Sequence, residues 1–356
     1  MLAASSKLEA QALRLTELVM REGRPILAEQ PLAFDPAFGG RRLVVQEADR
    51  VVSSLTILHR HLLVDGMQIP VGLIGSVVTD EAYRGTGLAS QLLLRAEDQL
   101  RAGGALLALL WADDAAFYET RGYASVGTEL DYRISSDLGS KLPPCDRVRT
   151  ATPSDIDQMH RLYCTQSERV DRKYEETQAL ALGPGIRALV HENQGQVDAY
   201  ALEGRGEDLQ GVIHEWAGSH VGVLACMAAH LAGLASKHDG LWCLVPARQV
   251  AMQSTLNALG APGVLGILGM GKLLRMDLAR DWFNRRTPAS VQVSATACQM
   301  RIQGPGGELE LDGAKVLQAL IPAKADRATL DKIENAIGLA LPELPEQPFL
   351  WGLDSI

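Results

Sequence analysis

The chain has 356 residues, which is long enough for two or three domains with their own hydrophobic cores. Hydrophobic residues make up 47% and charged residues 22%, as in ordinary soluble globular proteins. The formal net charge of −9 argues against a surface that binds nucleic acid or an anionic membrane, and it is compatible with cationic substrates.

The five cysteines lie far apart, without a C-x-x-C pair or a Cys/His cluster. We therefore expect neither a disulfide framework nor a metal site. The N-terminus has no basic segment followed by an apolar core, and no apolar run reaches 18 residues. These features favour a cytoplasmic location with reduced thiols.

The first third of the sequence predicts helix, hairpin and strand in that order. Helical spacing of apolar residues covers 6–29, a hairpin covers 43–63, and a further strand covers Ile69 to Thr79. That strand contains Gly72, Gly75 and Ser76, which are poor strand formers. Such residues often mark a bulge or a close approach by a ligand.

A glycine turn, Arg84-Gly85-Thr86-Gly87, follows this strand and leads directly into an amphipathic helix from Leu88 to Leu100. Glycines allow positive φ, so that successive N–H groups can point outward, and the start of a helix adds unpaired donors and a positive dipole end. The pattern predicts an anion site suited to a pyrophosphate.

The elements after this helix are a strand buried on both faces at 105–111 and a short helix with Phe117-Tyr118 that closes at Gly122-Tyr123. The polar stretch 135–146, with Pro143-Pro144, is typical of a linker.

The run Arg84 to Ala89 matches the pattern Arg/Gln-x-x-Gly-x-Gly/Ala, and together with the order strand, turn, helix and Phe-Tyr it resembles the GNAT superfamily of acyl-CoA-dependent N-acyltransferases. The resemblance covers roughly residues 36 to 134 and implies an α/β (α+β) fold with acetyl-CoA as co-substrate. It implies that backbone groups around Val77 and Val78 hold the thioester arm. It also implies a pyrophosphate site formed by Arg84, Gly85, Thr86, Gly87, Leu88 and Ala89.

The second third repeats the order of the first. A capped helix starts at Thr152, and it is followed by a hairpin at 187–202, strands at 209–216, 241–245 and 272–278, and helices at 221–236 and 253–260. We expect a tandem duplication with domains 1–140, 147–280 and 285–356. The second copy has Ala217-Gly218-Ser219-His220 in place of the glycine motif, and Leu256 aligns with Tyr118, so we expect this copy to be degenerate.

The last third predicts a strand at 291–302 and helices at 314–320 and 326–339. It ends in an apolar segment at 349–356, which we expect to be buried. Two acyltransferase units with a small α/β tail resemble the enhanced-intracellular-survival acetyltransferases, whose third domain is sterol-carrier-protein-like. In that type the terminal carboxylate reaches the first active site, and Ile356 is the matching position.

The expected reaction is direct attack of an amine on acetyl-CoA. An alkylammonium with a pKa near ~10.4 must lose a proton, while the departing thiolate can take one from a tyrosine with a pKa near ~10. Tyr118 fits this general-acid role. The strand 69–79 contains no Asp or Glu, so the carboxylate of Ile356 is an attractive proton acceptor, with Asp80, Glu81, Asp113 and Asp114 as alternatives.

The function expected is acetyl-CoA-dependent N-acetyl transfer to a primary amine of a small molecule or peptide, without a metal. The alternative is a non-catalytic protein that binds or senses acyl-CoA. A third reading makes the tail a lipid carrier with a cavity lined by Leu317, Leu320 and Ile321. The sequence determines neither the acceptor amine nor whether the protein forms a homo-oligomer.

Overall fold

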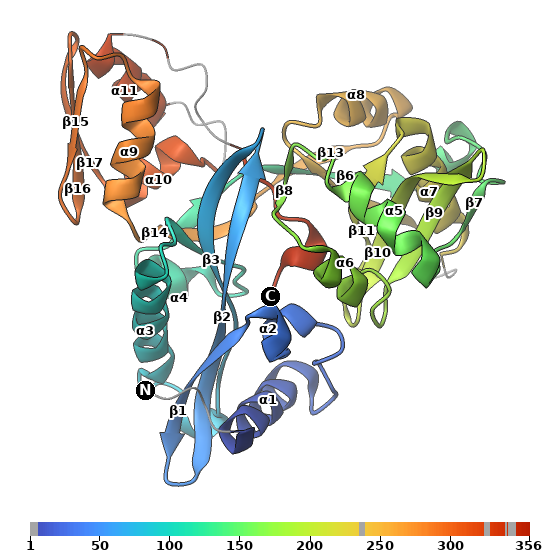
Figure 1. Cartoon of the computed structure of the whole chain (residues 1–356), viewed down its shortest axis with the longest axis horizontal. Helices are drawn as coiled ribbons and strands as arrows, with labels where there is room; N and C mark the ends of the chain where they lie inside the picture. The colour runs from blue at the N-terminus through green and yellow to red at the C-terminus, as the bar shows by residue number, and fades with distance from the viewer. Residues whose placement is uncertain (1–5, 235–238, 324–327, 339, 341–346) are drawn as a thin grey trace.

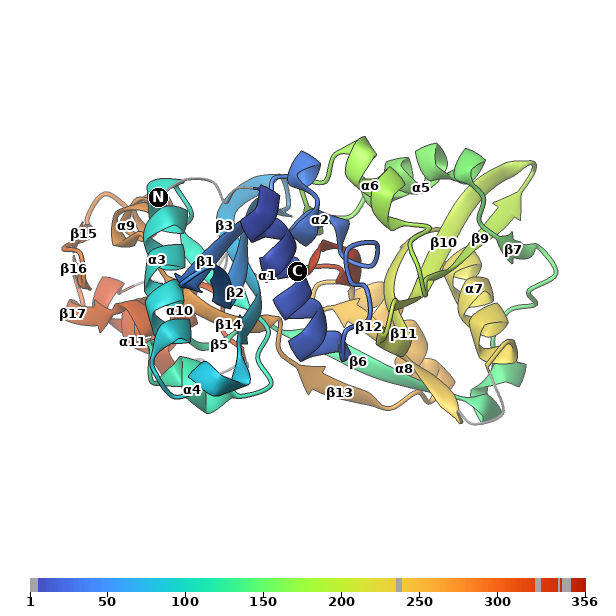
Figure 2. The same cartoon turned by 90° about the horizontal axis from the view of Figure 1, so that it is seen from below.

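The computed structural model describes residues 6–234, 239–323, 328–338, 340 and 347–356. Two α/β units lie side by side, and a small third unit packs on the first (Figures 1 and 2). The C-terminus returns to the middle of the molecule, between the first two units (Figure 1).

The first unit is a twisted sheet with helices on both faces. Its elements are α1 (Ser6–Arg21), α2 (Pro31–Phe34), β1 (Arg41–Glu47), β2 (Arg50–Val64), β3 (Met67–Thr79), α3 (Leu88–Ala102), β4 (Leu107–Leu110), α4 (Ala115–Glu119) and β5 (Ala124–Val126). The helix α3 connects β3 to the parallel strand β4 and buries Leu92, Leu93, Ala96 and Leu100 against the sheet. The helix, hairpin and strand predicted for this region are confirmed.

The second unit repeats the arrangement. Its elements are β6 (Glu129–Ser135), β7 (Val148–Thr150), α5 (Ile156–Tyr163), β8 (Glu168–Val170), α6 (Tyr174–Leu180), β9 (Arg187–Asn193), β10 (Gln196–Arg205), β11 (Asp208–Gly218), α7 (His220–Ala232), β12 (Gly240–Pro246), α8 (Val250–Leu259) and β13 (Gly263–Gly266). Here α7 connects the parallel strands β11 and β12, as α3 does in the first unit. The exception is β8, which pairs with β2 of the first sheet.

The first sheet contains two strands from the second half of the chain, β8 and β14 (Gly269–Leu273), and the second sheet contains one strand, β6, from the first half. The first sheet runs β1-β2-β3-β4-β14-β5, with β8 paired to β2. The second sheet runs β13-β6-β12-β11-β10-β9-β7. Each of the two sheets therefore contains a strand from beyond the proposed boundary at 140–147, so that neither sheet is complete without the other half.

The third unit starts with α9 (Met276–Arg286), which packs on the three-stranded antiparallel sheet β15 (Gln292–Ala295), β16 (Gln299–Gly304) and β17 (Gly307–Asp312). The helices α10 (Gly313–Leu320) and α11 (Ala328–Ile337) complete it. Leu317, Leu320 and Ile321, which we considered as the lining of a lipid cavity, are fully buried in the hydrophobic core.

Two predicted strands are corrected by the structure. The strand predicted at 272–278 ends at Leu273, and α9 begins at Met276. The strand predicted at 291–302 is a hairpin, because the Thr296 hydroxyl accepts the N–H groups of Cys298 and Gln299 and turns the chain. The helix predicted at 326–339 is α11 as far as the described residues reach.

The apolar end of the chain is buried as predicted: Phe349, Leu350, Trp351 and Leu353 are 5% exposed or less. Within the described residues, no helix is long and apolar enough to span a membrane.

Candidate functional site

The parallel strands β3 and β4 separate in the middle of the first sheet. They pair only from Val71 to Leu73 of β3, and within the described chain Ile74–Thr79 has no partner in β4. On its other side β3 bulges, since Thr56 pairs with Gly75 but Ser54 pairs with Val78, and Ser76 adopts φ +51°. The expected bulge is therefore present, and it leaves an opened stretch of backbone beside β4.

The two valines of this stretch point to opposite faces of the sheet. Val77 is half-buried in the cluster under α3, which also contains Tyr118, whereas Val78 is buried against α1. Their backbone lies in the gap between the strands, where an extended thioester arm would have to lie to pair with β3. Whether it does so stays a prediction.

The glycine turn between β3 and α3 is open. Gly85 and Gly87 adopt φ +78° and +85°, and a Cβ on either would meet no atom within 4 Å. The hydroxyl of Thr86 donates to the Tyr83 carbonyl oxygen at 2.6 Å, which holds the turn, and Arg84 is exposed beside it. Because the first N–H groups of a helix have no partner within the helix, the turn and the start of α3 present free donors and a cationic side chain to solvent.

Tyr118 lies on α4, whose N-terminus is capped by Asp114 through the Phe117 N–H at 3.3 Å. Its ring is half-buried between those of Phe117 and Tyr123, with centroids 5.0 and 5.8 Å away. Burial, followed by the charges of Asp113 and Asp114, raises the pKa of Tyr118 above its usual value. The phenol therefore keeps its proton at neutral pH and is available as a donor.

Two residues that sequence reasoning missed hold α4 and α3 in place. The guanidinium of Arg121 donates to the Ser90 hydroxyl at 2.7 and 3.0 Å and stacks over the Phe117 ring at 3.7 Å. On the exchanged strand β14, Lys272 bonds Glu97 at 2.7 Å, and Glu97 also accepts the Tyr123 hydroxyl at 3.2 Å. Arg121 lies in the Phe-Tyr motif and could have been noticed, whereas nothing near Lys272 in the sequence points to α3.

Ile356, the last residue of the sequence, lies against β3 at the bulge. A Cβ on Gly75 would overlap the carboxyl group of Ile356, so the glycine makes room for it. The side chain of Ile356 packs with Ile26, Ala33 and Phe34 of the segment around α2. The carboxyl group and Tyr118 thus approach opposite faces of the sheet, on either side of the opened stretch of β3.

The other carboxylates that we considered as proton acceptors have local roles or face solvent. Asp80 forms an ion pair with Arg50 and accepts the Ala82 N–H at 3.0 Å, and Asp114 caps α4. Glu81 and Asp113 are exposed. Against these, Ile356 presents its carboxyl group directly to β3.

The corresponding region of the second unit is closed. The strands β11 and β12 pair at Val212 and Ile213 and then separate, but the indole of Trp216 crosses the gap and donates to the Leu244 carbonyl oxygen at 2.9 Å. At the start of α7, the Ser219 hydroxyl accepts the Gly222 N–H at 3.2 Å and donates to the Asp198 carboxylate at 2.8 Å.

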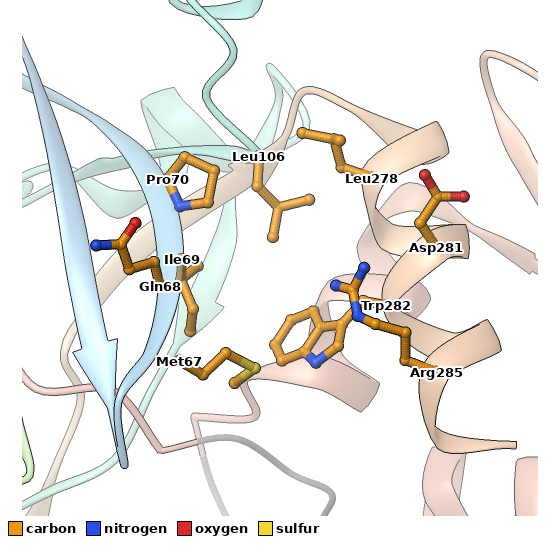
Figure 3. A pocket seen from close by; sticks show the side chains of 9 residues that line it. All are labelled: Met67, Gln68, Ile69, Pro70, Leu106, Leu278, Asp281, Trp282 and Arg285. Carbon is orange, nitrogen blue, oxygen red and sulfur yellow. The ribbon is translucent and has the colours of Figure 1, made fainter.

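A hollow of about 120 Å³ lies elsewhere, between the start of β3 and α9. Figure 3 shows Pro70, Leu106, Leu278 and Trp282 around it, with Asp281 and Arg285 on α9 at its side. It is at the opposite end of β3 from the bulge and belongs to the packing of the third unit on the first.

Comparison with known proteins supports the interpretation of the first unit. The model of a family described as an acetyltransferase (GNAT) domain matches residues 4–126. The matched residues include β3, the glycine turn, α3 and Tyr118.

Solved structures resemble the chain over its whole length. A GCN5-related N-acetyltransferase from Kribbella flavida is 14% identical with a TM-score of 0.64, over 100% of this chain and 99% of that one. A probable N-acyltransferase from Enterococcus faecalis is 11% identical with a TM-score of 0.67, over 98% and 97%. Eis1 from Mycobacterium abscessus is 14% identical with a TM-score of 0.57, over 98% of each chain.

At such low identity these likenesses show a shared fold, while the family model adds the sequence pattern of the first unit. Together they support an acyl-CoA-dependent N-acyltransferase. Residues 4–126 thus match the acetyltransferase (GNAT) domain family, and over its whole length the chain shares the fold of these solved structures.

Proposed function

We propose that this protein transfers the acetyl group of acetyl-CoA directly to a primary amine of a small molecule or peptide. The observation that carries the proposal is the contact between the carboxyl group of Ile356 and Gly75, at the bulge of β3 and beside its opened stretch. A carboxylate at this place can attract an ammonium group and accept its proton.

The acceptor has to lose a proton before it can attack. Keeping an alkylamine with a pKa near ~10.4 neutral at pH 7 costs roughly 4 to 5 kcal/mol. The Ile356 carboxylate accepts this proton, directly or through a water molecule. The amine nitrogen then attacks the thioester carbon, and the negative charge that develops on the carbonyl oxygen is stabilised by a backbone N–H near Val77 or Val78.

Collapse of this intermediate breaks the carbon–sulfur bond. The departing thiolate takes the phenolic proton of Tyr118, whose raised pKa keeps that proton available at neutral pH. The nitrogen loses its second proton on collapse, and this proton returns through water to the Tyr118 phenolate, while the Ile356 carboxyl group releases the first proton to solvent. The pyrophosphate is held by Arg84 and by the N–H groups from Gly85 to Ala89, where the open turn meets the positive end of α3.

The test is thiol release from acetyl-CoA in the presence of a panel of primary amines, with mass spectrometry of the products. We expect at least one amine to be acetylated by the full chain. Release that no amine stimulates, together with acetyl-CoA binding, would instead support the alternative of a non-catalytic acyl-CoA-binding protein.

A further inference from the structure

The last eight residues, Phe349–Ile356, form a terminal segment that docks into the second unit before it reaches the first. The Trp351 indole donates to the Glu168 carbonyl oxygen at 3.0 Å and packs edge-on against Trp216, with ring centroids 5.4 Å apart. Figure 1 shows this segment in red between the two units, ending beside α2. The residue that blocks the second gap therefore also supports the terminal segment.

Asp354 of the terminal segment is bound by a buried arginine of the second unit. Arg172 donates to its two carboxylate oxygens at 2.8 and 2.6 Å, and the Tyr163 hydroxyl donates to it at 2.9 Å. Arg172 also bonds Glu215 at 2.7 and 3.1 Å. The side chains of Arg172 and Asp354 are 0% exposed.

A second arginine holds the next residues. Arg205 on β10 is 1% exposed, and its Nη1 donates to the carbonyl oxygens of Gly352 and Ser355 at 2.7 and 3.1 Å and to the Ser355 hydroxyl at 2.8 Å. Its Nε donates to the Glu29 carbonyl oxygen at 3.2 Å, in the connection between α1 and α2. One side chain of the second unit thus joins the terminal segment to the first unit.

The terminal segment supplies a counter-charge to both buried arginines. Arg172 pairs with Glu215 and Asp354, and among carboxylates the charge of Asp354 acts most strongly on Arg205, ahead of Asp208 and Glu29, so removing Asp354 takes a counter-charge from each arginine. Leaving a buried charge uncompensated is strongly destabilising. Docking of the terminal segment is therefore part of the stable fold of the second unit.

The cluster also restricts where the terminal carboxyl group can be. Two extended residues span at most about 7 Å, so an anchored Asp354 confines the carboxyl group to that distance. Arg205 holds Ser355 as well, and the Ile356 side chain is packed beside α2. The direction and reach of the last residue are fixed from the second unit.

We propose that Arg172 and Arg205 are positioning residues for the first unit's reaction: they hold the terminal segment so that the Ile356 carboxylate lies against Gly75. The inference rests on the proposed role of this carboxylate as proton acceptor. By holding the terminal segment, the second unit, in which the gap between β11 and β12 is closed, places a reacting group in the site of the first unit.

The test uses the full chain with Arg205→Gln and Asp354→Asn, and Arg187→Gln as matched control. Arg187 likewise binds carbonyl oxygens, those of Ala229 and His230, but at the far end of α7. Carboxypeptidase A with mass spectrometry measures release of Ile356 from the folded protein. We expect at least tenfold faster release from Arg205→Gln and Asp354→Asn than from the wild type or the control.

The second readout is a double-mutant cycle in kcat with the best amine. Deleting Ser355 and Ile356 should lower kcat by about 100-fold, within the range of general-base catalysis. Arg205→Gln should lower it by a similar factor and add nothing in the deletion background, with unchanged affinity for acetyl-CoA. Arg205→Lys keeps the positive charge and should recover part of the lost kcat. If Arg205→Gln does not fold, Arg205→Lys is used in the cycle instead.

The inference would be overturned if carboxypeptidase A released Ile356 from both test variants as slowly as from the wild type. It would also be overturned if the kcat losses of Arg205→Gln and of the deletion multiplied when the two changes are combined. A deletion that leaves kcat unchanged would instead refute the role of the carboxylate, while the protection assay would still decide whether Arg205 and Asp354 hold the segment.

Discussion

The same strand geometry is an opened site in one unit and a packed core in the other. In both units a parallel pair, β3 with β4 and β11 with β12, separates after two or three paired residues. In the first unit, no side chain among the residues that the structure describes bonds across the gap beside Val77. In the second unit Trp216 bonds across it to Leu244. The backbone fold creates the gap in both units, and the side chains beside it determine whether a ligand can bind there.

The helix starts beside these gaps differ in the same way. At α3 the turn is built of glycines, with an exposed Arg84. At α7 the Ser219 hydroxyl caps the helix and bonds Asp198, which also bonds His191 at 2.5 Å. A carboxylate at a helix N-terminus takes the place that a phosphate would occupy and repels a second anion. One unit is expected to bind acyl-CoA and the other is not.

The largest effect is expected from Tyr118→Phe, which removes the phenol on α4 of the first unit. We expect kcat to fall by about 100-fold, because the thiolate loses its proton donor, with little change in affinity for acetyl-CoA. Steady-state kinetics and titration calorimetry measure the two quantities. Tyr174→Phe, on the second unit's α6, is the matched control, and an unchanged kcat in Tyr118→Phe would exclude the general-acid role.

A second prediction concerns the ionisable groups that the closed unit has buried. Burial lowers the pKa of His230 to about 4, and its Nε2 bonds the Ala201 carbonyl oxygen at 3.1 Å. Since an unfolded histidine titrates near ~6.5, the unfolded chain binds more protons, and stability is lost as the pH falls from 6.5 towards 4.

Relative to His230→Gln, the wild type should lose about 2 kcal/mol of unfolding free energy between pH 7.5 and pH 5. Urea denaturation at both pH values gives the difference. Burial raises the pKa of Glu129 to about 8, which changes the unfolding free energy with pH in the opposite direction. The comparison with His230→Gln cancels this contribution, because both proteins contain Glu129. Equal pH dependence of the two proteins would refute the buried neutral state of His230.

A smaller effect is expected from Gly87→Ala at the open turn. A left-handed conformation costs a residue with a Cβ roughly 1–2 kcal/mol, so in the free variant the turn should relax away from it. Binding must then restore the conformation, and the acetyl-CoA dissociation constant should rise about tenfold. Gly260→Ala is the matched control, because Gly260 has φ +87° after α8 of the second unit. Loss of affinity in both variants would show a general effect on folding, and no loss in either would remove the turn from the cofactor site.

The elements around the candidate site could be predicted because each depends on residues close in sequence. The turn 84–87 and the start of α3 are continuous in the sequence. The poor strand formers Gly75 and Ser76 predicted the bulge in β3. The burial of the terminal segment followed from its apolar composition. These are local signals of backbone conformation and hydrophobicity.

The strand exchange and the arginine cluster could not be predicted in the same way. Tyr132 of β6 pairs with Cys243, and Arg172 bonds a residue 182 positions later. Alternation along β6 suits a strand in either sheet, and an arginine in a loop is usually solvated. The hairpin at Thr296 was missed because its turn contains neither glycine nor proline.

The most direct test of the difference between the two units is titration calorimetry of the full chain with acetyl-CoA, for the wild type, Arg84→Glu and Asp198→Asn. We expect one molecule bound per chain, at least tenfold weaker binding in Arg84→Glu, and wild-type binding in Asp198→Asn. Two molecules bound per chain, or binding that Arg84→Glu leaves unchanged, would contradict this expectation.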